Sequence, residues 1–123
     1  MNLLDSSGWL EYFADGQNAE HFAEPLEHLD ELVVPTICLY EVFKVALREA
    51  GEAKALQAAA MMRRGKVVAI SEDIAIRAAK ISHEQKLPLA DSIILATAQV
   101  YEAVIWTQDA HFEGKPQVKY FAK

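Results

Sequence analysis

Short, largely apolar segments recur along the chain, and they constrain its fold more than any other feature. They are NLL at residues 2–4, LVVP at 32–35, KVVAI at 66–70, AVIWT at 103–107 and VKYF at 118–121. Strands without polar alternation are buried on both faces, as in parallel sheets that helices cover. The pattern therefore predicts an α/β/α sandwich with a central, mostly parallel sheet, in which KVVAI is the clearest central strand.

The segments between these strands have the periodicity and the end signals of helices. One runs over 36–50 before Gly51, with Thr36 as a possible N-cap, and another over 52–64 before Gly65. A third begins after Ser71, which is a good N-cap, and a fourth follows Pro88. Residues 6–15 also predict a helix, and residues 18–31 predict one that is bent or restarted at Pro25.

Length and composition narrow the class of protein. A chain of 123 residues with 52% hydrophobic content predicts one globular domain spanning 1–123. No apolar run approaches the roughly 20 residues that cross a bilayer, and the N-terminus has no basic region of a signal peptide. The lone Cys38 suits a reducing compartment, so we expect a cytoplasmic protein without a membrane association. The formal net charge of −6 argues against a general polyanion-binding surface, although it leaves room for metal-assisted action on nucleic acid.

Four acidic residues occupy positions where open α/β sheets form their sites. Asp5 ends the first strand, and Asp109 lies two residues beyond Thr107, the end of a later strand. Glu41 and Asp91 lie about one turn into their helices. If both helices begin at the same sheet edge, the four carboxylates converge on one cavity.

Each acid also has an ordinary structural interpretation. Asp5 and Asp109 suit helix caps or turns, and Asp91 suits the first turn of a helix. Glu41 can pair with Lys44 on a solvated helix face. Taken together, however, crowded carboxylates repel one another and destabilise a fold unless a divalent cation lies among them. Oxygen donors of this kind suit Mg²⁺ or Mn²⁺, and the set predicts a metal-dependent hydrolytic site.

Four motifs in this order resemble those of the PIN-domain family, and within it the VapC-type toxins of toxin–antitoxin pairs. They are LLDSSGWLEYF, TICLYEVFK, LPLADSIILATA and VIWTQDAHFEG, and the resemblance extends over essentially the whole chain. It implies an α/β/α sandwich with a central parallel sheet. It also implies Mg²⁺- or Mn²⁺-dependent endoribonuclease activity, an antitoxin partner and a homodimer.

The resemblance carries over a catalytic and metal-binding quartet of acids. Asp5 and Asp91 are expected to make the firmest metal contacts, Glu41 to align or deprotonate the attacking water, and Asp109 to complete a second, weaker metal position. Ser6 and Thr107 match positions where members of the family often have small hydroxyl residues that support the four acids. Where family members place a further acid beyond the last aspartate, this chain has His111 and then Glu113, which we interpret as a solvated histidine and a turn residue.

RNA also requires positive surface beyond a metal. Lys44 and Arg48 share the helix face of Glu41, so we expect them to contact phosphate. Arg63 and Arg64 precede Gly65 and more simply compensate a helix dipole. The aromatic residues Trp9, Tyr12, Phe13 and Phe22 suit a core, an oligomer face or an antitoxin groove.

Two rival functions share this pattern. A non-catalytic PIN-like binding module would have the fold without the acids, but all four acids are present. A receiver or phosphatase-type α/β protein also gathers aspartates at strand ends, yet it needs a lysine at a strand end. Here Ser71 and Glu72 follow the segment KVVAI instead.

Overall fold

A five-stranded parallel sheet forms the centre of the computed structural model, which describes all 123 residues. Every pair of neighbouring strands is parallel, and the order across the sheet is β3-β2-β1-β4-β5. The strands are β1 Asn2–Leu4, β2 Leu32–Pro35, β3 Lys66–Val68, β4 Val104–Thr107 and β5 Val118–Tyr120. The predicted parallel α/β/α fold is therefore confirmed.

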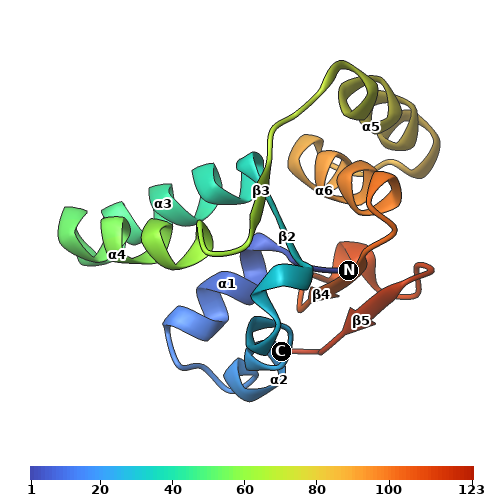
Figure 1. Cartoon of the computed structure of the whole chain (residues 1–123). Helices are drawn as coiled ribbons and strands as arrows, with labels where there is room; N and C mark the ends of the chain where they lie inside the picture. Colours follow the sequence, from blue (N-terminus) through green and yellow to red (C-terminus); the bar gives the residue numbers. More distant parts are fainter.

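Six α-helices flank this sheet (Figure 1). In the figure, α1 and α2 lie together, α5 packs on α6, and the α3–α4 pair projects to one side. The α-helices are α1 Ser6–Phe13, α2 Ala19–Ala23, α3 Thr36–Ala50, α4 Glu52–Met62, α5 Glu72–Gln85 and α6 Leu89–Val100. Three short 3-10 helices complete the chain: η1 Pro25–Glu27, η2 Leu29–Glu31 and η3 Ala110–Phe112.

The core lies where the central strands meet the helices. Leu3, Leu4 and Val33 are fully buried, as the unbroken apolar runs predict. Helix α1 passes so close to β1 that a Cβ added at Gly8 would lie 2.3 Å from a Leu4 methyl. Glycine therefore permits α1 to pack directly on β1. Asp5, the residue between them, is thereby held at the carboxyl edge of the sheet.

Two details of the predicted elements are wrong, and one of the two alternatives for residues 18–31 is confirmed. The segment KVVAI supplies only an edge strand, because β3 pairs with β2 alone and Val67 is 41% exposed. Residues 18–31 form α2, which ends at Ala23, and then two 3-10 turns, the first of which begins at Pro25. The predicted restart at Pro25 is therefore confirmed, because Pro25 has no amide hydrogen to continue α2. Thr36 begins α3 as its first residue, and its side chain makes no capping hydrogen bond.

The strand order reverses between β1 and β4. The chain proceeds from β1 to β2 and β3 on one side, then returns to the other side of β1 for β4 and β5. Such a reversal opens a crevice at the carboxyl ends of the two central strands, where α/β sheets bind ligands. Helix α3 follows β2 directly, and α6 runs back toward the start of β4, so both helices begin at this same edge.

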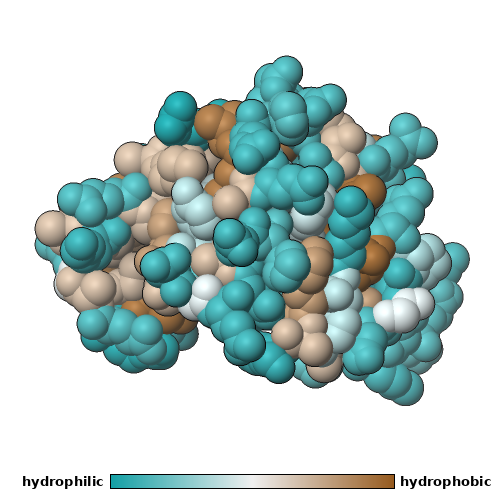
Figure 2. All heavy atoms as spheres, turned by 90° about the horizontal axis from the view of Figure 1, so that it is seen from below, coloured by the Kyte–Doolittle hydropathy of each residue, from teal (hydrophilic) through white to brown (hydrophobic).

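The surface is mostly hydrophilic, with apolar residues exposed in several places (Figure 2). Figure 2 shows apolar atoms gathered at the end of the molecule formed by α3 and α4. A groove of about 490 Å³ lies between α1, α3 and α4, and nine of its twelve lining residues are hydrophobic. None of the helices has both the length and the apolar character that crossing a membrane requires.

Candidate metal centre

Asp5 lies at the carboxyl end of β1 and caps α1. Its Oδ1 accepts hydrogen bonds from the Gly8 amide at 2.9 Å and from Ser7 Oγ at 2.8 Å. Its Oδ2 accepts a hydrogen bond from Thr107 Oγ1 at 2.6 Å. Burial raises the pKa of Asp5 to about 6, although these three hydrogen bonds act in the opposite direction. The capping interpretation is therefore correct, and yet it accounts for only one of the two carboxylate oxygens.

Thr107 connects Asp5 to the loop after β4. The Thr107 hydroxyl also accepts a hydrogen bond from the Asp109 amide at 2.8 Å. The Asp109 carboxylate in turn caps η3, because its Oδ1 accepts from the His111 amide at 2.9 Å. Strands β1 and β4 are neighbours, so the Thr107 hydroxyl fixes the position of Asp5, after β1, relative to that of Asp109, after β4.

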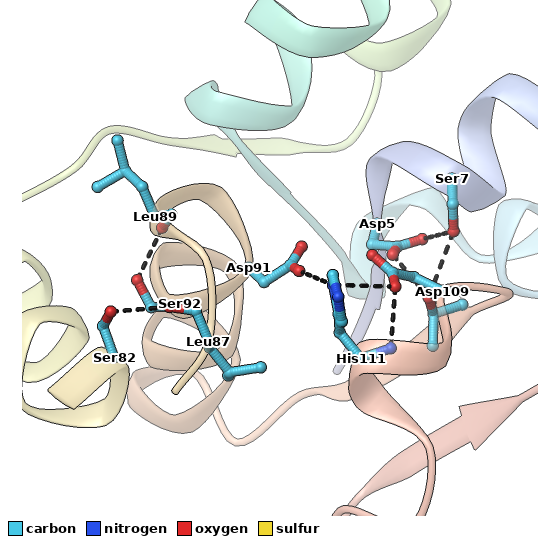
Figure 3. A network of polar contacts seen from close by, with 10 residues as sticks. Asp5, Ser7, Ser82, Leu87, Leu89, Asp91, Ser92, Asp109 and His111 are labelled. Carbon is cyan, nitrogen blue, oxygen red and sulfur yellow. Dashed lines mark hydrogen bonds and ion pairs between the residues drawn. The ribbon is translucent and has the colours of Figure 1, made fainter. Parts of the chain in front are cut away.

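Asp91 lies in the first turn of α6 and points toward the same loop (Figure 3). His111 Nδ1 lies 2.7 Å from Asp91 Oδ2 and 3.3 Å from Asp109 Oδ1. Burial raises the pKa of Asp91, and the negative charge of Asp109 raises it further. The hydrogen bond with Asp91 raises the pKa of His111, as does the charge of Asp109.

Glu41 completes the group from α3. Its Oε1 accepts a hydrogen bond from Ser6 Oγ at 2.6 Å, so the carboxylate is held toward the end of β1. No ion pair joins Glu41 to Lys44, and the solvated-pair interpretation is therefore wrong. Cys38, one turn before Glu41, is fully buried, and burial raises the pKa of its thiol, so it serves as a packing residue.

The four acids influence one another electrostatically. The charge of Asp109 raises the pKa of both Asp5 and Asp91, and the charge of Glu41 also raises that of Asp91. No lysine or arginine lies within ion-pairing distance of any of the four carboxylates. The only side chain among them that can carry a positive charge is His111, and it does so only when protonated, so the site concentrates negative charge.

The donor atoms fit a divalent cation. Ligand atoms of Asp91, Asp109 and His111 all lie within 4.8 Å of one another. Asp109 is 30% exposed and Asp91 14% exposed, which leaves the group open to an ion from solvent. Several carboxylate oxygens with room for water form the kind of donor set that Mg²⁺ and Mn²⁺ take.

The sequence missed two contributors to this site. Ser7, rather than Ser6, supports Asp5, and its Oγ also accepts a hydrogen bond from the Gln108 amide at 3.2 Å. His111 is exposed, as expected of a solvated side chain, but its ring also contacts two acids, which the sequence did not predict. The sequence does place a histidine two residues after the strand-end Asp109. Whether that side chain points toward the acids depends on the η3 turn, which the sequence did not predict.

The residues expected to contact RNA lie farther along α3. Lys44 and Arg48 are exposed one and two turns beyond Glu41, where Lys44 lies over the Tyr40 ring and Arg48 pairs with Glu49. Glu113 is exposed at the end of η3 and makes no ion pair. Of the four acids, only Asp91 and Asp109 belong, together with His111, to a group whose ligand atoms all lie within 4.8 Å of one another. Asp5 and Glu41 lie near enough to affect this group through their charges, and the structure does not add Lys44, Arg48 or Glu113 to it.

The PIN domain family profile matches residues 3–117, which include all four acids. The chain belongs to the PIN domain family. A comparison with curated protein sequences found no match.

Solved structures with the PIN fold include VapC-type toxins and their complexes. A chain of a toxin–antitoxin complex from Klebsiella pneumoniae is 28% identical, with complete coverage of both chains and a TM-score of 0.81. VapC20 of Mycobacterium tuberculosis, a toxin that cleaves the sarcin–ricin loop, is 15% identical over 94% of this chain and 95% of its own, with a TM-score of 0.77. A DNA-bound VapBC complex from Salmonella typhimurium is 19% identical over 99% and 98%, with a TM-score of 0.79.

Proposed function

We propose that this PIN domain is a Mg²⁺- or Mn²⁺-dependent endoribonuclease that hydrolyses RNA phosphodiester bonds, and that it is the toxin of a type II toxin–antitoxin pair. The observation that carries the proposal is the group of acids at the carboxyl edge of the sheet, where Asp91 and Asp109 lie close together and neighbouring acidic charges raise the pKa of Asp5 and Asp91 without a lysine or arginine partner. An uncompensated cluster of this kind destabilises a fold unless a cation binds to it. Membership of the PIN family and the toxins among its structural neighbours support the same activity.

In this proposal, Asp5, Asp91, Asp109 and Glu41 hold the ion. A bound divalent cation supplies Lewis acidity, which lowers the pKa of water and offsets the negative charge of a phosphate. The chain's own groups fix the geometry. Thr107 and Ser7 orient Asp5, and Ser6 donates to Glu41 Oε1, which leaves Glu41 Oε2 to accept a proton from the attacking water.

Cleavage of RNA with and without chelator tests the activity. We expect the protein to cut a labelled RNA pool in Mn²⁺, to lose this activity in EDTA, and to regain it when Mn²⁺ is restored. Attack by water rather than by the ribose 2′-hydroxyl predicts products without a 2′,3′-cyclic phosphate. RNA binding without cleavage would instead support a non-catalytic binding module. Uptake of a phosphoryl group with intact RNA would support a receiver, which the family match already disfavours.

We propose further that an antitoxin segment occupies the apolar groove between α1, α3 and α4, and that the toxin acts as a cytoplasmic homodimer. Phe13 is 38% exposed and lines this groove with Tyr12, whereas Trp9 and Phe22 are fully buried in the core. The toxin–antitoxin complexes among the structural neighbours support a protein partner. Co-expression with the product of a short neighbouring reading frame should yield a complex, and Phe13→Ser should weaken it without altering RNA cleavage.

A further inference from the structure

The His111 ring lies among the acids although most of it faces solvent. Its Nδ1 is 2.7 Å from Asp91 Oδ2 and 3.3 Å from Asp109 Oδ1, while 56% of the side chain is exposed (Figure 3). An exposed ion pair of this kind contributes little to the stability of a fold, because solvent screens the two charges. Holding the fold together is therefore a weak explanation for where this ring lies.

Two sets of contacts fix the backbone of the turn that carries the ring. Asp109 Oδ1 accepts from the His111 amide and so closes the η3 turn, and the next residue, Phe112, is fully buried. The Asp109 amide is itself held by Thr107. The same turn that positions the Asp109 carboxylate thus also positions the imidazole, and the two donor groups are presented as a unit toward Asp91.

The spacing of the three groups matches that of ligands on one ion. Donors on adjacent positions of an octahedral cation lie about 3 Å apart, because each lies about 2.1 Å from the ion. The two separations at His111 Nδ1 bracket this value, and all three donors lie within 4.8 Å of one another. In the metal-free chain Nδ1 is hydrogen-bonded to Asp91, and a cation bound at this point would take the place of the Nδ1 proton. His111 Nε2 makes no hydrogen bond to the protein, so it can keep the remaining proton while the Nδ1 lone pair faces the ion.

We propose that His111 Nδ1 is a nitrogen ligand of the cation held by Asp91 and Asp109, and that it makes this position prefer Mn²⁺ to Mg²⁺. The inference rests on the proposed metal-dependent function and adds a donor of a different chemical class. Mg²⁺ selects oxygen ligands and keeps much of its water, whereas imidazole nitrogen binds first-row transition ions well. Loss of the imidazole is therefore expected to weaken the binding of Mn²⁺ much more than the binding of Mg²⁺.

Electron spin echo spectroscopy of the Mn²⁺-loaded full chain tests this ligand directly, because it detects nitrogen bonded to the ion. We expect histidine nitrogen modulation in the wild type, its loss in His111→Asn, and its retention in His83→Asn. His83 is an exposed histidine on α5 and makes no side-chain contact with the acids, so it is a matched control. Calorimetry of His111→Asn should show Mn²⁺ affinity lowered about 10-fold or more, with Mg²⁺ affinity changed less than about 3-fold.

The outcomes separate this inference from the proposed function. Mn²⁺ binding that depends on Asp91 but gives no nitrogen modulation would overturn the His111 ligand and leave the metal site intact. Nitrogen modulation that persists in His111→Asn would also overturn it. Absence of any Mn²⁺ or Mg²⁺ binding would overturn both. Because His111 is exposed, its replacement should leave the melting temperature of the metal-free protein nearly unchanged, and the conservative variant His111→Gln repeats the test if His111→Asn is unstable.

Discussion

The Thr107 hydroxyl donates a 2.6 Å hydrogen bond to Asp5 Oδ2, which joins the carboxyl ends of two neighbouring strands. Thr107 Oγ1 also accepts a hydrogen bond from the Asp109 amide. The substitution Thr107→Val keeps the shape of the side chain but removes a hydrogen bond from each of the two acids. We expect cleavage to fall about 10–100-fold, as for groups that orient metal ligands. Initial rates on one RNA substrate measure the loss.

Thr107→Ser is the matched control because it retains the hydroxyl. It should keep most of the activity, and both variants should fold cooperatively, although Thr107→Val loses about 1–3 kcal/mol through its unpaired buried neighbours. Full activity in Thr107→Val would contradict the role of this hydrogen bond.

Asp5→Asn should make the metal-free protein more stable at neutral pH while it abolishes cleavage. The folded-state pKa of Asp5 is raised from 3.8 to about 6, so its proton favours folding. The favourable contribution is fully present below pH 3.8, declines as pH rises toward 6, and is lost above it. A shift of this size corresponds to about 3 kcal/mol against the ionised form. Denaturant unfolding in EDTA at pH 7.5 measures the gain.

Two further measurements make this prediction specific to the charge. The stability difference between Asp5→Asn and wild type should shrink below about pH 4, where the wild-type carboxyl is already protonated. Saturating Mn²⁺ should raise the melting temperature of the wild type and leave that of Asp5→Asn nearly unchanged. A variant less stable than wild type at pH 7.5 would show that Asp5 acts mainly as a helix cap.

Glu41→Gln should lower the turnover rate about 100-fold or more with little change in fold. The amide oxygen still accepts from Ser6 Oγ, but the group no longer takes a proton from water. Glu49→Gln is the control, because Glu49 lies on the same helix and is exposed beside Arg48. Single-turnover rates should separate the two variants, and equal rates would remove Glu41 from the chemistry.

Lys44 and Arg48 should affect RNA binding rather than the chemical step. The double substitution Lys44→Gln and Arg48→Gln is expected to raise KM several-fold at low salt and to reduce the salt dependence of binding. Arg77 pairs with Asp73 on α5 much as Arg48 pairs with Glu49 on α3, so Arg77→Gln is a matched control. Unchanged KM in the double variant would place the RNA on another surface.

The fold could be predicted because its signals are local. Unbroken apolar runs such as NLL and VIWT indicated buried parallel strands, and Ser71 does cap α5 as its sequence suggests. The position of KVVAI could not be predicted, because whether an apolar run lies at the centre or the edge depends on strand order. That order is set by packing between distant segments, which periodicity does not encode.

Part of the candidate site could likewise be predicted from the sequence, and part could not. The sheet edge shared by Asp5 and Asp109 follows from parallel topology, and the start of α6 at that edge follows from its place before β4. The roles of Ser7 and His111 depend on rotamers and on the η3 turn. Two serines precede Gly8, and their roles differ only through the direction of each side chain: Ser6 supports Glu41, and Ser7 supports Asp5.

Calorimetric titration with Mn²⁺ of the wild type, Asp91→Asn and Asp73→Asn tests the central claim most directly. Asp91 and Asp73 both lie in the first turn of a helix, but only Asp91 faces the other acids, whereas Asp73 pairs with Arg77 at the surface. We predict that Mn²⁺ binds the wild type and Asp73→Asn equally and binds Asp91→Asn at least about 10-fold more weakly. Equal Mn²⁺ binding by all three proteins, or binding by none, would contradict a metal centre at the converging carboxylates.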